Sequence, residues 1–331
     1  MVAMRRASGT RLIVVLVLLA SATAGCGVTR GDDSRDLLMI IPNSPGGGYD
    51  QTGRAAVAVM EDADITGGSF TVDNVVGAGG AGAMTSLVGR AGDEHTMMTV
   101  GLGVVGSTYS FGSDYTLQDA TPLAQLMSEP EAVLVPGDSP YQTIGDLAEA
   151  WKADPGSISV GGGSSPGGPD HLFPMELADE LGIDPNDVNY VTYDGGGPLT
   201  SALLGEKIDV GFSGLAEFVG QVESGELRVL AVSGKERYPD GPFAEVPTLT
   251  EEGIDLEFLN WRGVLAPPEL SEERTDQLIG YLEEMHDSEG WQETLDENGW
   301  TDDFKTGEDF ATFIDQQDAR VSGTLQELGL L

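Results

Sequence analysis

The sequence is poor in cysteine and in basic residues, and each shortage limits what the protein can do. Cys26 is the single cysteine among 331 residues, so no disulfide bond can form within the chain. Lysine and arginine together number 16 against 55 aspartates and glutamates, which gives a formal net charge of −39. Because a nucleic-acid-binding protein needs a basic surface, this balance argues strongly against nucleic acid as a partner.

Motifs typical of metal sites and of enzymes are also scarce. The sequence contains no H-E-x-x-H motif, EF-hand loop or cysteine cluster, so we expect no metal ion and no other cofactor. The segment Gly211–Leu215 falls short of the hydrolase motif G-x-S-x-G, because a leucine replaces the last glycine. We therefore expect that the protein is not an enzyme. The alternative is an extracytoplasmic hydrolase that uses Ser213 and His171.

The segment Gly101–Gly106 fits the motif G-x-G-x-x-G and follows a predicted strand. A dinucleotide site would need a helix next and an acidic residue about 20 residues further on. Asp119 stands near that spacing, but residues 107–114 are rich in serine, glycine and aromatic residues and predict a poor helix. We expect a loop that lines a cleft, with Gly103 in it, rather than a dinucleotide site.

The apolar run Leu12–Ala20 is too short to span a membrane. Basic residues at positions 5, 6 and 11 precede it, and small residues with Thr23–Cys26 follow it, a pattern that predicts an export signal. This segment resembles a bacterial lipoprotein signal in which Cys26 becomes the lipidated N-terminus of the mature chain. Residues 27–35 would then be a flexible tether. The alternative is a free thiol in a leader that is discarded.

Glycine, in contrast, is abundant, with 47 residues. Glycine-rich turns follow several apolar runs and precede predicted helices. They lie in the segments Pro42–Asp50, Gly77–Gly82, Gly161–Pro169 and Tyr193–Pro198. The first N–H groups of a helix lack a partner within the helix, and the helix dipole adds positive charge there, so such turns favour a bound anion. A plain strand-to-helix turn that needs glycine for its angles explains each turn alone equally well.

Strands that alternate with helices predict an α/β fold with a parallel sheet. In open sheets of this kind, ligands bind at the carboxyl ends of the strands, where these turns would meet. After the first turn we expect a helix over residues 54–61, with Asp50 or Thr52 as its cap. The runs Leu123–Met127 and Ala132–Val135 read as two short segments, separated at Glu129 and Pro130.

Segments along the whole mature chain together resemble one family, the substrate-binding proteins of tripartite tricarboxylate transporters. These proteins are Bug-type extracytoplasmic solute receptors. The matching segments are Ile41–Asp50, Asp73–Asn74, Gly77–Gly80, Gly163–His171, Tyr193 with Gly195 and Gly196, Leu227–Val232, Val246–Leu249 and Asn260–Pro268. The resemblance implies the two-domain fold of periplasmic binding proteins, the type II Venus flytrap, with a hinge and an interdomain cleft. Domain 1 would comprise residues 36–134 and 265–331, and domain 2 residues 135–264.

The resemblance also implies a ligand, a di- or tricarboxylate such as citrate, held mainly by backbone N–H groups. It further implies that the partner is the set of membrane permease subunits of the transporter. A receptor for a sensor kinase is a further alternative. The proposed ligand-binding residues are Ser44, Gly46, Gly47, Gly48, Asp50, Gly79, Gly80, Gly103, Ser164, Ser165, Gly167, His171, Tyr193, Gly195 and Ser213. Arg54 could bind a carboxylate, but a structural ion pair is favoured. Trp261 and Arg262 could close over the ligand, or they could belong to the hinge or the core.

Overall fold

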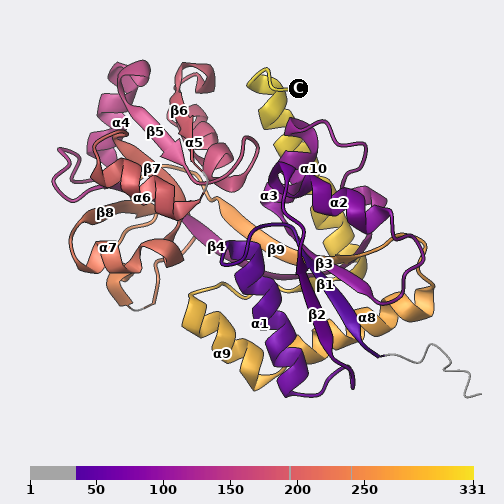
Figure 1. Ribbon diagram of the computed structural model, residues 1–331. Coiled ribbons are helices and arrows are strands. Elements are labelled where there is room, and N and C mark those ends of the chain that lie inside the picture. Colours follow the sequence, from indigo (N-terminus) through magenta and orange to yellow (C-terminus); the bar gives the residue numbers. More distant parts are fainter. Residues whose placement is uncertain (1–34, 194, 240) are drawn as a thin grey trace, which may run out of the picture. The chain divides into compact units, whose positions relative to one another are not determined.

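The computed structural model describes residues 35–331 except 194 and 240 (Figure 1). The predicted lipoprotein signal with Cys26, and the predicted tether except its last residue, lie outside the described residues. Within the described part of the chain, no helix is long and apolar enough to cross a membrane.

The first lobe is built on the strands β1 (Leu37–Ile41), β2 (Phe70–Asn74), β3 (Thr96–Gly101) and β9 (Leu259–Ala266). β1 lies between β2 and β3 and is parallel to both, whereas β9 runs antiparallel to β3. All the residues of β3 are buried, and so are all but the first of β9, because helices and neighbouring strands cover both. A short strand, β10 (Lys305–Thr306), also belongs to this lobe.

The second lobe is built on β5 (Ser159–Gly162), β6 (Asn189–Thr192), β7 (Val210–Gly214) and β8 (Leu227–Val232). β5 lies between β6 and β7 and is parallel to both. Each lobe therefore contains a parallel set of three strands, flanked by antiparallel neighbours. The predicted parallel sheet is wrong for the central strands, because their pairing is set by distant parts of the chain.

Strand β4 (Thr121–Pro136) passes through both lobes. Its first part pairs antiparallel with β9, ending at the pair Pro130–Leu259, and from Glu131 onward it pairs with β7 and β8. The two short runs that the sequence predicted are thus one strand. Proline cannot donate a ladder hydrogen bond, and it is tolerated here because Pro130 lies at the point where β4 changes partners.

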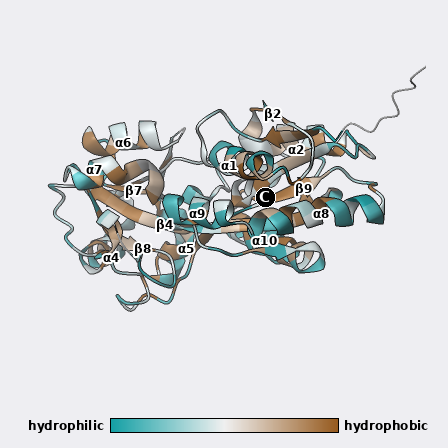
Figure 2. Cartoon of the chain, turned by 90° about the horizontal axis from the view of Figure 1, so that it is seen from below, coloured by the Kyte–Doolittle hydropathy of each residue, from teal (hydrophilic) through white to brown (hydrophobic). Residues whose placement is uncertain are grey.

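Helices cover the strands on both lobes. They are α1 (Gly48–Asp62), α2 (Ala81–Val88), α3 (Leu102–Ser110), α4 (Ile144–Ala153), α5 (Pro169–Glu180), α6 (Gly196–Leu204), α7 (Val219–Glu223), α8 (Glu272–His286), α9 (Glu289–Asn298) and α10 (Gly307–Glu327). Short 3-10 helices are η1 (Ala78–Gly80), η2 (Leu117–Asp119), η3 (Pro155–Ser157), η4 (Pro185–Asp187), η5 (Leu215–Phe218) and η6 (Gly241–Phe243). Figure 1 shows α1 beside α9 and α3 beside α10. Figure 2 shows hydrophobic residues along strands such as β9 and hydrophilic residues along helices such as α8.

Two helix predictions need correction. α1 begins at Gly48 with Gly47 as its N-cap, six residues earlier than expected, so neither Asp50 nor Thr52 caps it. The segment that follows Gly101 is not a loop but the helix α3. Its intrinsic helix propensity is low, and burial of Val104, Val105 and Thr108 against the core supplies the stability instead.

Three buried clusters hold the described chain together. One lies in the first lobe, around Met60 and Trp291, and another in the second lobe, around Phe218. The third runs through both lobes and includes Phe173 on α5 and Phe258 before β9, whose ring centroids are 5.2 Å apart. Because this shared core joins the lobes, residues 35–331 form one compact unit.

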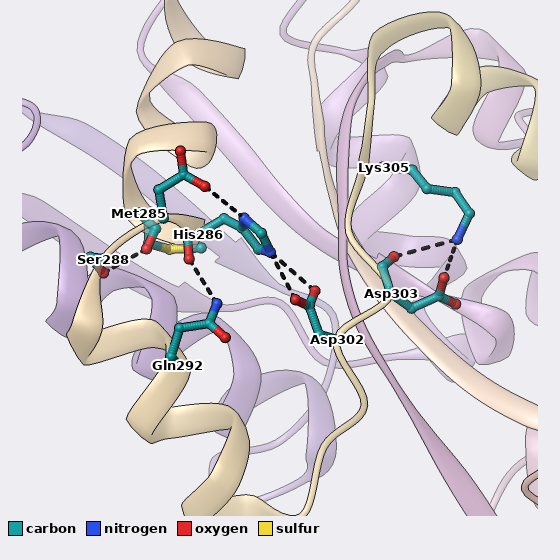
Figure 3. A network of polar contacts seen from close by, with 8 residues as sticks. Met285, His286, Ser288, Gln292, Asp302, Asp303 and Lys305 are labelled. Atoms are coloured by element: carbon teal, nitrogen blue, oxygen red, sulfur yellow. Dashed lines mark hydrogen bonds and ion pairs between the residues drawn. The ribbon is translucent and has the colours of Figure 1, made fainter. Parts of the chain in front are cut away.

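A polar network fixes the turn between α8 and α9 (Figure 3). The His286 ring stacks on Phe304, and its Nε2 lies 3.0 Å from a carboxylate oxygen of Asp302. The Gln292 side chain donates to the backbone carbonyl of His286 at 2.9 Å, and Lys305 forms an ion pair with Asp303. None of these six residues lines the large cleft described below.

Candidate functional site

A cleft of about 780 Å³ is lined by residues of both lobes. The first lobe contributes the turn before α1, the segment 76–79 and the start of α3. The second lobe contributes the turn before α5, the turn before α6 and the end of β7. The glycine-rich turns therefore meet at a single cavity, as the sequence predicts.

Four helices begin at this cleft, two from each lobe. The cleft is lined by Gly47 and Gly48 at the start of α1, Gly103 at α3, Gly168 at α5 and Gly195 at α6. Each helix start brings backbone N–H groups and the positive end of a helix dipole. Gly195 has φ +91°, a conformation that an L-residue rarely adopts, so the turn before α6 requires glycine there. The arrangement is suited to an anion with more than one charged group.

The two lobes touch at one side of the cleft through bare backbone. A Cβ atom added to Gly106 on α3 would lie 1.8 Å from the carbonyl oxygen of Gly167, in the turn before α5. The hydroxyl of Ser110 donates to the carbonyl oxygen of Pro166 at 2.8 Å. This contact is possible because two glycines face each other, and it holds the two glycine-rich walls together.

The floor of the cleft carries charged side chains, in contrast to its glycine-rich walls. Glu129 and Glu131 lie two residues apart on β4, and Asn260 and Arg262 lie two residues apart on β9, so each pair faces the same side of the sheet. We call these four residues the floor patch. Glu129 and Arg262 form an ion pair in which both side chains are about nine-tenths buried. The Asn260 amide donates to the same carboxylate at 3.4 Å.

Arg262 is the only lysine or arginine among the described residues that line the cleft. Its guanidinium lies against the first residue of α1, since a Cβ on Gly48 would be 2.3 Å from Nη2. It also lies 5.9 Å from the ring centroid of Tyr49, whose hydroxyl accepts a hydrogen bond from the Val104 amide. Burial raises the pKa of Tyr49 to about 12, so this hydroxyl stays neutral. A side-chain cation thus reinforces the positive end of α1.

Glu131 is the most isolated charged group of the floor patch. It is fully buried, and neither carboxyl oxygen has a well-formed hydrogen bond to a described residue, although the Asn260 side chain lies close enough to favour its ionised form. Burial, together with the negative charges of Asp170 and Glu129, raises the pKa of Glu131 well above its usual value. Arg262 and Asn260 oppose this shift without cancelling it.

Most of the proposed ligand-binding residues line the cleft. These are Ser44, Gly46, Gly47, Gly48, Gly79, Gly103, Ser164, Ser165, Tyr193, Gly195 and Ser213. The structure brings them together from both lobes, although they are spread over 170 positions of the sequence (213 − 44 + 1). Their contact with a ligand remains a prediction.

Four proposed residues, Asp50, Gly80, Gly167 and His171, lie behind the cleft surface rather than on it. The Asp50 carboxylate accepts hydrogen bonds from the Gly46 amide at 2.9 Å, and from Asn74 and Arg54 at 2.8 Å each. Burial opposes its ionisation, but these hydrogen bonds outweigh burial and lower the pKa of Asp50. Asp50 thus supports the first glycine-rich turn, and the prediction of a structural ion pair for Arg54 is confirmed.

His171 supports the turn before α5 in the same way. Its Nδ1 accepts a hydrogen bond from the Gly167 amide at 3.2 Å, and its ring packs edge-on against Tyr190. Burial lowers the pKa of His171 to about 4, which leaves the ring neutral. Since Ser213 lines the cleft and His171 does not, the geometry does not present the two as a nucleophile with its base.

Sequence reasoning missed several residues that line the cleft, namely Glu129, Glu131, Asp170 and Asn260, and left Arg262 undecided. One signal was available. Two acidic residues two apart inside an otherwise apolar strand place two carboxyl groups on one buried face, which is costly unless they serve the site. The partners on β9 follow 129 or more positions later (260 − 131), and nothing local in the sequence pairs them.

The sequence profile of the TctC family, described as the tripartite tricarboxylate transporter family receptor, matches residues 55–330. The chain therefore belongs to this family of solute receptors. It is similar to the protein BugT of Bordetella pertussis, with 26% identity over 97% of this chain and 98% of BugT. The predicted family is confirmed.

Two solved structures from Rhodopseudomonas palustris share the fold. Rpa4515, solved with adipate, has a TM-score of 0.77 at 22% identity, covering 89% of this chain and 97% of its own. MatC, solved with bound malate, has a TM-score of 0.72 at 23% identity, covering 88% and 99%. These likenesses confirm the predicted fold class, the two-lobed α/β fold of periplasmic binding proteins.

Proposed function

We propose that the protein is an extracytoplasmic receptor that binds a di- or tricarboxylate, such as citrate, in the cleft and delivers it to a membrane permease. One observation carries this proposal, the convergence of four helix N-termini from both lobes on one cavity. Such a cavity favours anions, and a ligand with two or more carboxylates can meet both lobes at once.

The energetics are compatible with a micromolar complex. The net charge of −39 repels anions at long range, but salt screens this repulsion beyond about 10 Å. Hydrogen bonds to a charged group contribute roughly 1.5–3 kcal/mol each. Five or six of them offset an association cost of about 4–15 kcal/mol and leave about −8 kcal/mol, which corresponds to a micromolar dissociation constant.

We propose two domains close to the earlier expectation, with the boundaries moved to the points where β4 and β9 change lobe. Domain 1 would comprise residues 36–130 and 259–331, and domain 2 residues 131–258. β4 and β9 are the two strands near these boundaries. A ligand that contacts both domains stabilises the state in which the cleft is closed, because only that state offers both sets of contacts.

We also propose that a lipid on Cys26 anchors the receptor to the outer face of the cell membrane. Support comes from the sequence pattern before Cys26 alone, and the family comparison does not extend to it. Intact-mass spectrometry of the membrane-extracted protein would show a diacylglycerol adduct that Cys26→Ser lacks. A soluble protein cleaved elsewhere and carrying no lipid would refute the anchor but leave the receptor proposal standing.

The ligand proposal is tested by isothermal titration calorimetry of residues 36–331 with citrate, malate and adipate, using ribose and putrescine as uncharged and cationic controls. We expect at least one carboxylate to bind in the micromolar range and the controls not to bind. Binding of the sugar or the amine alone would refute the ligand class. A strain that lacks the gene tests the partner. If it still takes up the carboxylate but no longer induces genes in response to it, the sensor-kinase alternative replaces delivery to a permease.

A further inference from the structure

The floor patch contains the carboxyl group of Glu131, whose burial neither the fold nor the charge of the cleft explains. Glu131 is held rigidly by its backbone, whose N–H donates to the Ser233 hydroxyl at 2.8 Å and whose carbonyl accepts from the Ser233 amide at 2.9 Å. The side chain lines the cleft and is fully buried, and among the described residues only Asn260 lies near its oxygens, without a well-formed hydrogen bond. A buried carboxyl group without a partner is costly, so a folded protein retains it only where another constraint requires it.

We propose that Glu131 is a specificity-determining residue that selects, among carboxylates, those that also carry a hydroxyl group. This inference rests on the proposed function, because it assumes that a carboxylate enters the cleft. The charged ends of the ligand would remain at the helix N-termini, and its hydroxyl group would reach the floor patch.

The surroundings of Glu131 reject a second carboxylate at the floor. Glu129 lies on the same strand and already neutralises Arg262, the only lysine or arginine among the described lining residues. The charge of Asp170 on α5 also acts on Glu131. A ligand carboxylate placed here would meet acidic groups from two elements without a spare cation, and the repulsion is strong where water is excluded.

The same surroundings favour a hydroxyl group over an ammonium group. Glu131 is faced by Glu129, Asp170, Arg262 and Asn260, and when ionised it would also act on the hydroxyl groups of Tyr190 and Tyr238. Burial and the neighbouring carboxylates favour the neutral carboxyl form of Glu131. A neutral carboxyl group donates one hydrogen bond and accepts another, which is also what a hydroxyl group does, whereas an ammonium group only donates.

Matched ligand pairs test this directly. Malate differs from succinate, and citrate from propane-1,2,3-tricarboxylate, by one hydroxyl group. At about pH 7, we expect calorimetry of the wild-type protein to give the hydroxy acid of each pair a dissociation constant lower by about tenfold or more. Equal affinities within both pairs would overturn the proposal, and this comparison needs no variant.

Two substitutions then assign the preference to Glu131. Glu131→Gln keeps a donor and an acceptor at the same place, so the ratio within each pair should stay within about threefold of the wild-type ratio. Glu131→Met removes both, so the ratio should fall towards one, through weaker binding of the hydroxy acid alone. Asp302→Asn, outside the cleft, is the matched control and should leave the ratio unchanged (Figure 3).

Two results would overturn the assignment to Glu131. One is a hydroxyl preference that survives in Glu131→Met. The other is tightest binding of aspartate with loss of that binding in Glu131→Gln, which would identify an ammonium site instead. If no carboxylate binds the wild-type protein, the proposed function fails and this inference fails with it. If carboxylates bind without regard to the hydroxyl group, only the inference fails.

Discussion

The walls and the floor of the cleft present different chemical groups to a ligand, mainly backbone in the walls and charged side chains in the floor. The walls present mainly backbone, with glycines at the starts of four helices and a single acidic side chain, Asp170, in the first turn of α5. The floor presents Glu129, Glu131, Asn260 and Arg262 on two long strands that pass between other elements. Backbone donors recognise negative charge with little regard to the rest of the ligand, whereas fixed side chains can discriminate between ligands. In the proposed receptor, the walls would therefore supply most of the affinity and the floor most of the selectivity.

The largest expected effect comes from breaking the ion pair of the floor. Glu129→Leu leaves the Arg262 guanidinium buried without its carboxylate and should lower the free energy of unfolding by about 3–5 kcal/mol. The double variant Glu129→Leu/Arg262→Met should recover most of that loss, because it removes both charges together. Urea denaturation measures both values. A single variant as stable as the wild type would show that the pair is not buried as described.

The double variant also sharpens the comparison between walls and floor. It should still bind a carboxylate through the helix N-termini, but more weakly, because Arg262 no longer reinforces the start of α1. Unchanged affinity in calorimetry would mean that the floor contributes nothing to carboxylate binding.

The walls are tested by adding a single methyl group. Gly106→Ala places a Cβ 1.8 Å from the Gly167 carbonyl oxygen and should cost about 3 kcal/mol, because backbone must move on both lobes. Gly280→Ala on α8 is the matched control, since a Cβ there meets nothing within 4 Å and should stabilise the helix by about 0.5–1 kcal/mol. Equal melting temperatures for the two variants would contradict the contact between the lobes.

A smaller effect is expected from the protonation of Glu131. Its pKa in the folded protein lies above the ordinary value of 4.5, so the folded state holds its proton to higher pH than the unfolded chain does. Stability is therefore lost as the pH rises from about 4.5 through the folded pKa. Glu131→Gln cannot ionise, and we expect it to be more stable than the wild type by about 1–2 kcal/mol near pH 7, with the difference shrinking towards pH 4. A difference that grows as the pH falls would reverse the assigned direction of the pKa shift.

The smallest effect is expected outside the cleft. Asp302→Asn weakens the contact with His286 in the network of Figure 3, where the Asp302 side chain is 46% exposed. Such partly exposed pairs contribute little, so we expect a loss below about 1 kcal/mol and no change in ligand affinity. Thermal unfolding and calorimetry measure the two quantities, and altered affinity would show that this network communicates with the cleft.

Three of the four helix starts in the walls, those of α1, α5 and α6, were predictable from the sequence, because the signal for each is local. A strand, a glycine-rich turn and a helix start are contiguous in the chain, and four such units predict a shared edge wherever the strands lie in one sheet. The exact helix starts were less predictable. α1 begins at Gly48, earlier than the polar residues Asp50 and Thr52 suggested, because Asp50 bonds back to the turn instead of capping the helix.

The floor was only partly predictable, because the spacing of Glu129 and Glu131 is a local signal but their partners depend on pairing between distant strands. β4 and β9 meet across more than 120 positions (259 − 130 = 129 at the last pair), and proline at position 130 suggested a break where the strand only changes partners. Likewise, α3 forms from a segment of poor helix propensity because its buried face packs on the core. Only tertiary contacts decide such cases, so Glu131 and Arg262 could not be assigned from spacing alone.

A crystal structure of residues 36–331 with bound citrate or malate tests the central claim most directly. The account predicts carboxylate oxygens within hydrogen-bond distance of backbone N–H groups in the first turns of α1 and α6, so that one ligand joins both lobes. A ligand bound outside the cleft, or held inside it by the side chains of a single lobe, would contradict the account.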